Sequence, residues 1–404
     1  MSTPERWLAV VGIGDDGPAS LTSAGRALIE QAEVLVGGSR HLGWFADHPA
    51  LKLPWARPFE DSFARIEAQR GRPVVVLATG DPMCFGAGTR LARRFGIDVM
   101  TIVPSPSAFS LACARLGWSL PDTACVTLHG RPADALRMHL APGLRLLALS
   151  WDGSTPACVA RILTEAGYGG SWMAALEHLG GPDERRIEGV AQTWAHPPGA
   201  DLNTVAIVCA LDRGRLPRPC APGLPDDAFR HDGKLTKREV RAATLARLMP
   251  LPGQRLWDVG AGSGAVAIEW LRASSTGRAI AIEREPARIA DLAANAAALG
   301  VPQLEIHQGT APACLEGLAP PDAIFIGGGL ASPGMLEACA DALSAGGRLV
   351  ANAVTLEAER VLLEAHSRLG GELVRLAVSR AEPVGGFTGW RPLMTVTQFA
   401  WIKP

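Results

Sequence analysis

The sequence predicts an α/β protein with two domains, and three observations support this. Short apolar, β-rich runs alternate with helical stretches along the whole chain, as in sheets covered by helices. With 404 residues, 48% of them hydrophobic, the chain can form more than one buried core. A proline-rich stretch near the middle interrupts the alternation. We therefore expect two successive α/β domains.

The first half contains several strand signals and ends at the prolines. Four prolines lie between residues 211 and 232, where they exclude a helix interior or a central strand. We predict a first domain over residues 1–212, a linker over residues 213–232 and a second domain over residues 233–404. The strands expected in the first domain include residues 8–14, 74–80, 144–150 and 204–210.

The second half begins with a strong helix signal. Thr236 is the expected N-cap, Glu239 follows three residues later as the capping-box partner, and Leu235 and Val240 can form a hydrophobic staple. Helices should separate the strands that follow. These strands are expected at residues 255–259, 279–283, 304–308, 323–327 and 348–353.

Composition limits the possible partners and the cellular location. A net charge of −1 offers no broad positive field for a nucleic acid. No apolar run is long enough to span a bilayer, and the N-terminus leads directly into a strand, so we expect a cytoplasmic protein without a membrane partner. The 8 cysteines form no CxxC pair, which indicates neither a metal site nor a disulfide framework.

A glycine-rich loop lies between a predicted strand and a predicted helix in the second half. It runs from Asp258 to Gly264 and reads DVGAGSG. Glycines at such a turn allow close approach of a ligand to the helix N-terminus. Because the pattern Gly260-x-Gly262-x-x-Ala265 also fits a dinucleotide loop, the glycines alone leave NAD and S-adenosylmethionine both open.

Two acidic residues narrow the choice of cofactor. Asp258 lies two residues before the first glycine, where a dinucleotide loop usually has an apolar residue because a pyrophosphate must approach. A carboxylate at this place suits a ligand that carries an ammonium and a sulfonium group. Glu283 ends the next predicted strand, where an acid can accept hydrogen bonds from both ribose hydroxyls. Glu283 therefore supports a nucleoside without choosing between the two cofactors.

This arrangement resembles the class I methyltransferase fold, a Rossmann-like domain with a seven-stranded sheet. The sequence at residues 325–329, FIGGG, differs from the motif with which amino-directed nucleic-acid methyltransferases hold a base, which disfavours a base as substrate. Together with residues 223–227 and 235–241, the loop resembles the C15-methylating, decarboxylating enzymes of cobalamin biosynthesis. The resemblance implies cofactor contacts at Thr236, Asp258, Gly260, Ala261, Gly262, Ser263, Gly264, Glu283 and residues 309–311, which include Ala311.

The first half resembles the tetrapyrrole methylase family. The matching motifs occur in order: GIG at 12–14, residues 20–42, TGDP at 79–82, PSPSAF at 104–109, LHGR at 128–131 and EHLGGPDE at 177–184. That family has two α/β subdomains with S-adenosylmethionine in the cleft between them. One departure is the loop GIGDDG, where the family more often has Pro-Gly after GIG. The cofactor contacts implied for this half are Gly80, Asp81, Ser107 and Ala108.

The two halves together resemble the C5- and C15-methylating enzymes of cobalamin biosynthesis joined in one chain. The resemblance implies one S-adenosylmethionine per domain, methylation of a precorrin at C5 and C15, and decarboxylation of its C12 acetate to give precorrin-8. His129, Arg131 and Arg238 are the predicted contacts for this tetrapyrrole and its carboxylates. Self-association through the second half is also implied. No residue is assigned to the decarboxylation.

Three other hypotheses about the function remain open. An NAD-dependent oxidoreductase fits the glycine pattern and Glu283 but leaves the first half unexplained. One half could instead bind a tetrapyrrole or cofactor without turnover, as a chaperone or regulator does. An RNA methyltransferase is disfavoured by the absence of a basic stripe and of the amino-methylating motif.

Overall fold

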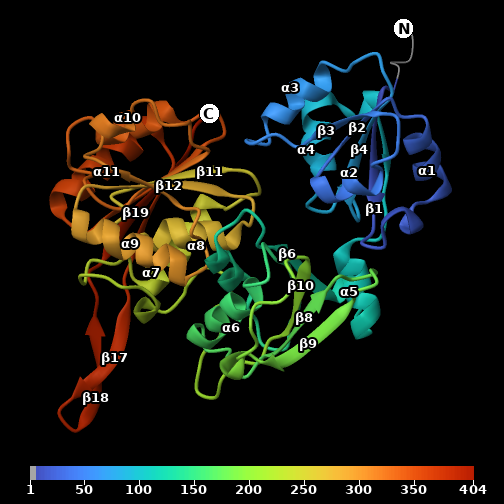
Figure 1. Cartoon of the computed structure of the whole chain (residues 1–404). Helices are drawn as coiled ribbons and strands as arrows, with labels where there is room; N and C mark the ends of the chain where they lie inside the picture. Colours follow the sequence, from blue (N-terminus) through green and yellow to red (C-terminus); the bar gives the residue numbers. More distant parts are fainter. Residues whose placement is uncertain (1–5) are drawn as a thin grey trace. The chain divides into compact units, whose positions relative to one another are not determined.

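The structure, a computed structural model, describes residues 6–404, so residues 1–5 of the predicted first domain lie outside the described residues. The chain folds into two compact units (Figure 1). The first comprises the residues up to Arg131 together with Pro142–Arg215, and the second comprises Pro132–Ala141 and Leu216–Pro404. Sheets and helices alternate along the chain in both units, which confirms the predicted α/β fold class.

A parallel five-stranded sheet forms the first part of the first unit, with the strand order β3-β2-β4-β1-β5. The central strands β1 and β4 are buried along nearly their whole length, as the apolar runs of a parallel sheet require. The strands are β1 (Leu8–Ile13), β2 (Val34–Gly37), β3 (Leu51–Pro54), β4 (Val74–Thr79) and β5 (Met100–Val103). The helices are α1 (Ser23–Glu30), α2 (Ser39–Trp44), α3 (Asp61–Glu67) and α4 (Ala87–Phe95).

A second five-stranded sheet completes the first unit, in the order β6-β7-β10-β8-β9. Here β6 and β7 are parallel, whereas β10 and β9 run antiparallel to their neighbours. Two sheets in one unit agree with the two subdomains that the tetrapyrrole methylase resemblance implies. The elements are α5 (Ala108–Leu116), β6 (Thr123–Thr127), β7 (Arg145–Leu149), α6 (Thr155–Glu165), β8 (Trp172–Glu177), β9 (Arg185–Val190) and β10 (Asn203–Val208).

The second unit is built on a seven-stranded sheet with the order β13-β12-β11-β14-β15-β19-β16. The strands from β11 to β15 pair in parallel. Strand β19 runs antiparallel to both of its neighbours, β15 and β16. The strands are β11 (Arg255–Val259), β12 (Arg278–Glu283), β13 (Glu305–Gln308), β14 (Ala323–Ile326), β15 (Arg348–Ala353), β16 (Glu372–Leu376) and β19 (Val396–Ile402). All five strands predicted for this half are present.

Helices cover both faces of this sheet. Along β11 the side chains alternate, so that Leu256 joins a core beneath α7, α8 and α9, whereas Trp257 and Val259 join a core beneath α10 and α11. This double burial explains the apolar strands of the second half. The helices are α7 (Arg238–Leu248), α8 (Ala265–Ala273), α9 (Pro286–Ala298), α10 (Met335–Ala342) and α11 (Leu356–Leu369).

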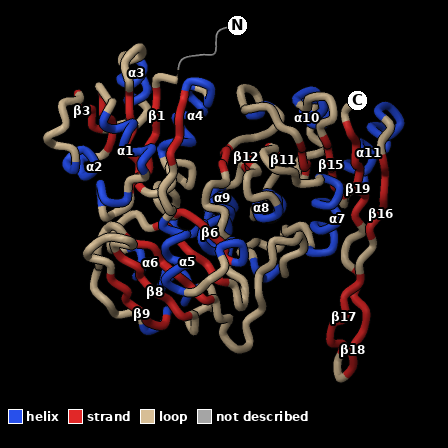
Figure 2. Tube along the Cα trace, turned by 90° about the vertical axis from the view of Figure 1, so that its right-hand side faces the viewer, coloured by secondary structure: helices blue, strands red, loops and turns tan. Residues whose placement is uncertain are grey.

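A two-stranded hairpin extends from the seven-stranded sheet (Figure 2). It consists of β17 (Ser379–Val384) and β18 (Phe387–Pro392), inserted between β16 and β19. Three of its apolar side chains are largely exposed: Val384 by 64%, Phe387 by 84% and Trp390 by 77%. The hairpin therefore presents apolar surface that the rest of its own unit does not cover.

The start of α7 differs from the sequence prediction. The N-cap is Lys237, without a side-chain cap, and not Thr236. The carboxylate of Asp226 replaces the predicted cap, because it accepts the backbone N–H of Arg238 at 2.9 Å. A capping group twelve residues away along the chain leaves no local signal in the sequence.

The division into two compact units differs in detail from the predicted domain boundary. Leu224 and Phe229, inside the predicted linker, are only 1% and 4% exposed and belong to the core beneath α8. The segment Pro132–Ala141, predicted to lie in the first domain, belongs to the second unit, where Met138 packs on the same core. The structure thus shortens the linker and assigns a loop of the first half to the second.

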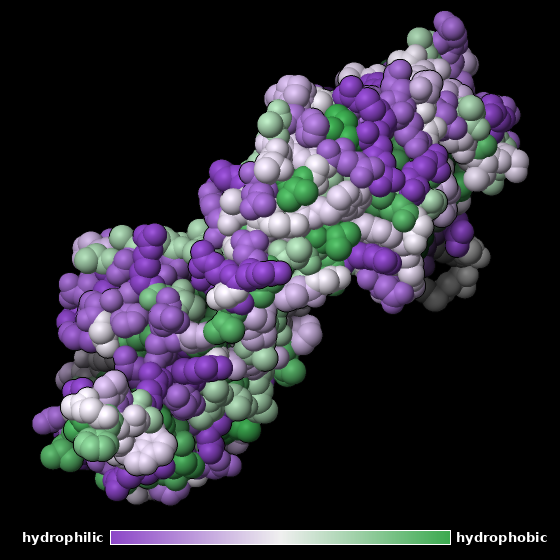
Figure 3. Space-filling view, turned by 90° about the horizontal axis from the view of Figure 1, so that it is seen from below, coloured by the Kyte–Doolittle hydropathy of each residue, from purple (hydrophilic) through white to green (hydrophobic). Residues whose placement is uncertain are grey.

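Polar and apolar residues are intermixed over short distances on the face shown in Figure 3. Within residues 6–404, the helices are too short or too polar to cross a membrane.

Candidate active sites

A cavity of about 320 Å³ opens in the second unit at the carboxyl ends of β11, β12 and β14. Open α/β sheets bind ligands at this place, where the loops diverge from the strand ends. The predicted residues that line it are Thr236, Gly260, Ala261, Gly262, Ser263, Glu283 and Ala311. Gly264 is not in the lining, but it supports the loop as the residue before α8, with φ +77°.

The loop after β11 depends on glycine for its shape. Gly260 has φ +72°, and a Cβ there would lie 2.8 Å from the Cα of Gly328, in the segment after β14. These two backbones can touch only because neither residue carries a side chain. Their contact forms one wall of the cavity and leaves backbone groups facing a ligand.

Glu283 closes the cavity on the side of β12. It is 5% exposed, and one carboxylate oxygen accepts the N–H of Gly262 at 2.8 Å. The other oxygen accepts the N–H groups of Arg284 and Glu285 at 2.9 and 3.0 Å. Because a carboxylate has about four acceptor sites, one remains for a ribose hydroxyl. The predicted hydrogen bonds from both ribose hydroxyls stay a prediction, because the structure leaves one acceptor site.

Asp258 lies beneath the loop and is not part of the cavity lining. It is 1% exposed, and Oδ2 accepts the N–H of Ala267 in the first turn of α8 at 2.9 Å. Burial, with a smaller effect from the nearby carboxylate of Glu283, raises the pKa of Asp258 to about 7. Its position indicates that it supports the loop, and a direct contact with a ligand stays a prediction.

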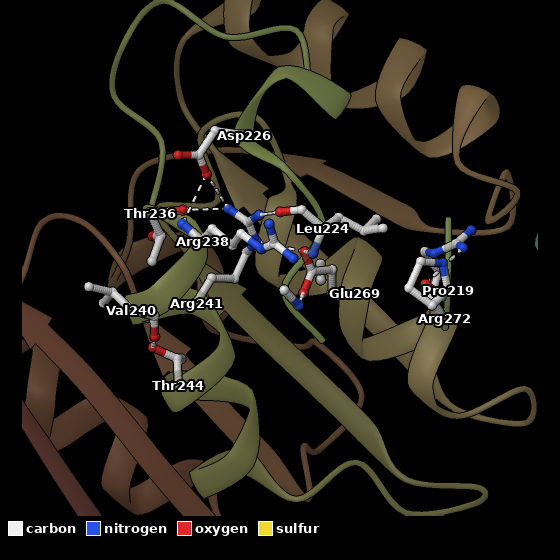
Figure 4. A network of polar contacts seen from close by, with 12 residues as sticks. Pro219, Leu224, Asp226, Thr236, Arg238, Val240, Arg241, Thr244, Glu269 and Arg272 are labelled. Carbon is white, nitrogen blue, oxygen red and sulfur yellow. Dashed lines mark hydrogen bonds and ion pairs between the residues drawn. The ribbon is translucent and has the colours of Figure 1, made fainter. Parts of the chain in front are cut away.

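A buried ion pair holds the segment that carries Thr236 (Figure 4). Arg241 and Glu269 are 0% and 1% exposed, and the Arg241 Nε lies 2.7 Å from a Glu269 oxygen. Arg241 also donates to the carbonyls of Thr236, at 2.5 Å, and Leu224. Glu269 accepts the N–H groups of Gly223 and Leu224 at 2.6 and 3.0 Å. The pair thereby fixes the backbone on one side of the cavity.

Three cations that were not predicted from the sequence line this cavity: Lys234, Arg284 and Arg288. Arg288 donates twice to Asp232, at 2.8 and 2.9 Å. The predicted substrate contact Arg238 is exposed and lies outside the cavity lining. The position of Arg284, directly after Glu283, was the one signal that could have identified a cation here.

A small cavity of about 50 Å³ lies in the first unit, lined by residues from both of its sheets. Two of the predicted cofactor residues, Gly80 and Ala108, line it together with Asp15 and Asn203. Close backbone packing forms this region, because a Cβ at Gly12 would lie 2.0 Å from the carbonyl oxygen of Gly80. The GIG and TGDP motifs therefore meet at the carboxyl ends of β1 and β4.

The other two predicted cofactor residues of this half, Asp81 and Ser107, stabilise local backbone structure through their side chains. Asp81 accepts the N–H of Met83 at 2.8 Å, and Ser107 caps α5 by accepting the N–H of Ser110 at 3.1 Å. Neither lines the small cavity, although Ala108 follows Ser107 directly. Their contact with a cofactor stays a prediction.

A larger cavity of about 720 Å³ in the first unit shares Thr79, Leu202 and Asn203 with the small one. The predicted residue His129 lines it, and the Arg131 guanidinium lies 5.9 Å from the ring centre of Phe85 in its wall. Arg131 itself is exposed and is not in the lining. Aromatic residues and arginine in the lining suit a large, flat, anionic molecule. The aromatic and cationic lining side chains include Arg40, His41, Trp55, Phe85, Trp151 and His178.

Residues 6–404 contain no cluster of three or more His, Cys, Asp or Glu side chains that could hold a metal ion.

Two family models match the chain, one in each half. A model of tetrapyrrole (corrin/porphyrin) methylases matches residues 8–195. A model of the precorrin methyltransferase domain matches residues 227–403. The families and their order agree with the resemblances found in the sequence.

Known proteins match both the whole chain and its parts. A cobalt-precorrin-7 C(5)-methyltransferase from Salmonella typhimurium is 34% identical over 181 residues, 44% of this chain and 88% of that protein. A protein of Pyrobaculum aerophilum, named as a probable cobalt-precorrin-6B C(15)-methyltransferase (decarboxylating), is 32% identical over 182 residues, 43% of this chain and 93% of that protein. A precorrin-6Y C(5,15)-methyltransferase (decarboxylating) from Sinorhizobium sp is 49% identical over 402 residues, 98% of this chain and 96% of that protein. The chain therefore belongs to the family of precorrin-6Y C(5,15)-methyltransferases (decarboxylating), which are S-adenosylmethionine-dependent enzymes of cobalamin biosynthesis.

Proposed function

We propose that the two methylations are divided between the two units, each with its own S-adenosylmethionine. The first unit methylates C5 of the precorrin. The second methylates C15 and removes the carboxyl group of the C12 acetate as carbon dioxide. The observation that carries the proposal is the presence of two separate cavities, each at the carboxyl ends of the strands whose motifs were matched to a cofactor.

The residues in the second cavity fit S-adenosylmethionine. The glycine contact between Gly260 and Gly328 leaves room for the backbone to approach the ligand, and Glu283 keeps an acceptor site for ribose. The side chain of Met335 and the ring of Phe325 supply apolar surface in the same lining. When bound, the cofactor supplies the methyl group, and the protein aligns it and excludes water.

Cations near both cavities suit the carboxylates of the substrate. Arg40 lines the large cavity of the first unit, and Lys234, Arg284 and Arg288 line the cavity of the second. Arginine binds carboxylates through two parallel hydrogen bonds, which fixes their orientation. We assign to these residues the carboxylate contact predicted for Arg238, because Arg238 lies outside the lining.

Filling the small cavity should separate the two activities. Ala108 lines this cavity of about 50 Å³, so Ala108→Phe should block the cofactor of the first unit. We expect methylation at C5 to fall about a hundredfold, the effect of a displaced reactant, while methylation at C15 and release of carbon dioxide continue. The measurement is mass spectrometry of precorrin-6Y treated with methyl-labelled S-adenosylmethionine, with the position of each label read from the fragments.

The control for this experiment is Ala108→Ser, which adds one oxygen atom and should leave both labelled methyl groups in the product. If Ala108→Phe loses the methyl group at C15 and keeps the one at C5, the division of labour is the reverse of the one proposed.

We also propose that the chain self-associates through the second unit, with the hairpin β17–β18 as the contact. Its side chains Phe387 and Trp390 are 84% and 77% exposed. The two side chains lie three residues apart in β18 and so point to opposite faces of the hairpin, and large aromatic side chains are enriched at protein interfaces. A second copy of the chain can cover this surface from its own hairpin.

Removing the aromatic side chains of the hairpin should dissociate the assembly. For Phe387→Ser combined with Trp390→Ser, we expect the molar mass measured by light scattering to fall to that of a single chain. The control is Leu356→Ser, which removes an apolar side chain that is 80% exposed at the start of α11. An unchanged mass in the hairpin variant would exclude the hairpin as the contact.

A further inference from the structure

Three histidines line the large cavity of the first unit: His41, His129 and His178. Among residues 6–404, His178 is the one of the three with a carboxylate partner, because its Nδ1 lies 2.7 Å from Oδ2 of Asp15. The other oxygen of Asp15 accepts Nη1 of Arg40 at 2.6 Å. Asp15 is 10% exposed in its side chain and so bridges a histidine and an arginine in a mostly buried position.

The backbone holds His178 in an uncommon conformation. Its φ is +50°, in the left-handed region that side chains other than glycine rarely adopt. Two backbone hydrogen bonds fix this turn: the His178 N–H donates to the carbonyl of Leu202 at 3.0 Å, and the Gly181 N–H donates to the carbonyl of His178 at 2.8 Å. Such strained residues cluster at functional sites. The turn directs the imidazole to the cavity.

We propose that His178 is the proton acceptor for methylation in the first unit, and that Asp15 is the residue that positions it. This inference rests on the proposed assignment of C5 methylation to that unit. A hydrogen bond from Nδ1–H to the Asp15 carboxylate leaves the lone pair of the imidazole on Nε2, and the carboxylate stabilises the imidazolium that forms. The large cavity shares Thr79, Leu202 and Asn203 with the small cavity proposed for the cofactor. The proposed methyl donor and proton acceptor therefore belong to adjoining cavities.

The reaction needs such an acceptor for charge balance. The new bond joins the methyl group to the meso carbon, and the electron pair of the broken sulfur–methyl bond stays on sulfur as a neutral thioether. The ring gains one positive charge and must lose one proton. When the hydrogen of the methylated carbon leaves to Nε2 of His178, the electron pair of that C–H bond restores the double bond of the ring.

The other groups of the cavity are less suited to this role. Burial, with the charge of Arg40 next, lowers the pKa of His41 to about 4, which makes it a weak base. Burial raises the pKa of the Cys84 thiol and keeps it neutral. His129 is exposed, and the charged groups Arg40 and Asp201 complete the titratable lining. His178 therefore combines an orienting carboxylate with access to the cavity.

The decisive variant is His178→Gly. Glycine adopts a φ of +50° without strain, so the turn should fold, and the vacated space can admit free imidazole. In the full chain, we expect the rate of C5 methylation to fall about a hundredfold or more, with the KM for S-adenosylmethionine nearly unchanged. Added imidazole should restore part of the rate. A substrate deuterated at C5 should react more slowly in the variant, because proton removal then limits the rate.

Two further variants complete the test. Asp15→Asn should lower kcat and move the pH profile of C5 methylation, because the imidazole loses its orienting charge. His196→Gln, an exposed histidine on the same unit, should change nothing. Full C5 methylation in His178→Gly would overturn the inference, as would a loss that imidazole does not restore and that shows no isotope effect. If Ala108→Phe keeps its C5 methylation, the assignment of C5 methylation to the first unit has failed. That result can be told apart from a failure of the His178 inference, because it comes from a different variant.

Discussion

Replacing Gly260 with alanine is expected to lower the rates of methylation at C15 and release of carbon dioxide about a hundredfold while leaving methylation at C5 intact. A Cβ at this position would lie 2.8 Å from both N and Cα of Gly328, and the backbone φ of +72° is itself strained for alanine. Because both collision partners are backbone atoms, the loop after β11 must move away from the segment after β14. A displacement of about 1 Å at a reacting centre costs about a hundredfold in rate.

Gly253→Ala provides the matched control. Gly253 also has a positive φ, +80°, but a Cβ there would meet nothing within 4 Å. Both variants carry the same backbone strain of about 1–2 kcal/mol, so the difference between them reports the collision with Gly328 alone. The measurement is the number and position of labelled methyl groups, together with binding of S-adenosylmethionine by calorimetry. Two binding events per chain in Gly260→Ala would contradict the prediction.

Glu269→Ala is expected to destabilise the second unit by about 3–5 kcal/mol, the range for removing one partner from a buried ion pair. Arg241, which is 0% exposed, would lose the carboxylate at 2.7 Å and keep the weaker contact with Asp226 at 3.3 Å, and the N–H groups of Gly223 and Leu224 would lose their acceptor. The segment that carries Thr236 should loosen as well. The KM for S-adenosylmethionine in C15 methylation should therefore rise.

The control is Glu239→Ala at the start of α7. Glu239 pairs with Arg380 at 2.7 Å, but its side chain is 44% exposed, so its loss should cost less than about 1 kcal/mol. Unfolding in urea, followed by hydrogen exchange of peptides from α7 and α8, measures both variants in the full chain. Equal effects of the two substitutions would show that burial does not set the strength of this ion pair.

The sequence predicted the parts of the structure that depend on local signals. The strand, glycine loop and helix around Gly260 lie in consecutive residues, and Glu283 ends the neighbouring strand, so their meeting follows from parallel pairing. The pairing of the GIG and TGDP motifs follows from the same rule for β1 and β4. These features can be predicted from the periodicity of apolar residues and the parallel direction of the strands alone.

Features that depend on distant segments could not be predicted in this way. Asp226 caps α7 from outside the helix, so the nearer Thr236 was chosen incorrectly. The cations Lys234 and Arg288 reach the cavity from elements that carry no motif of their own. Asp15 and His178 pair although they lie 163 positions apart. Asp15 stands in the loop GIGDDG that departs from the family pattern and His178 stands in the motif EHLGGPDE, but nothing in either local sequence links one to the other.

The segment Pro132–Ala141 has a consequence for how this enzyme could be divided into subunits. It lies between β6 and β7 in the sequence, yet it belongs to the second unit, where Leu136 is completely buried and a Cβ at Gly300 would lie 2.4 Å from the N of Met138. The polypeptide consequently passes from one unit to the other three times.

A single break near residue 215 would therefore not release two finished proteins. The C-terminal fragment would lack a piece that covers α9, and the N-terminal fragment would carry that piece as an apolar loop.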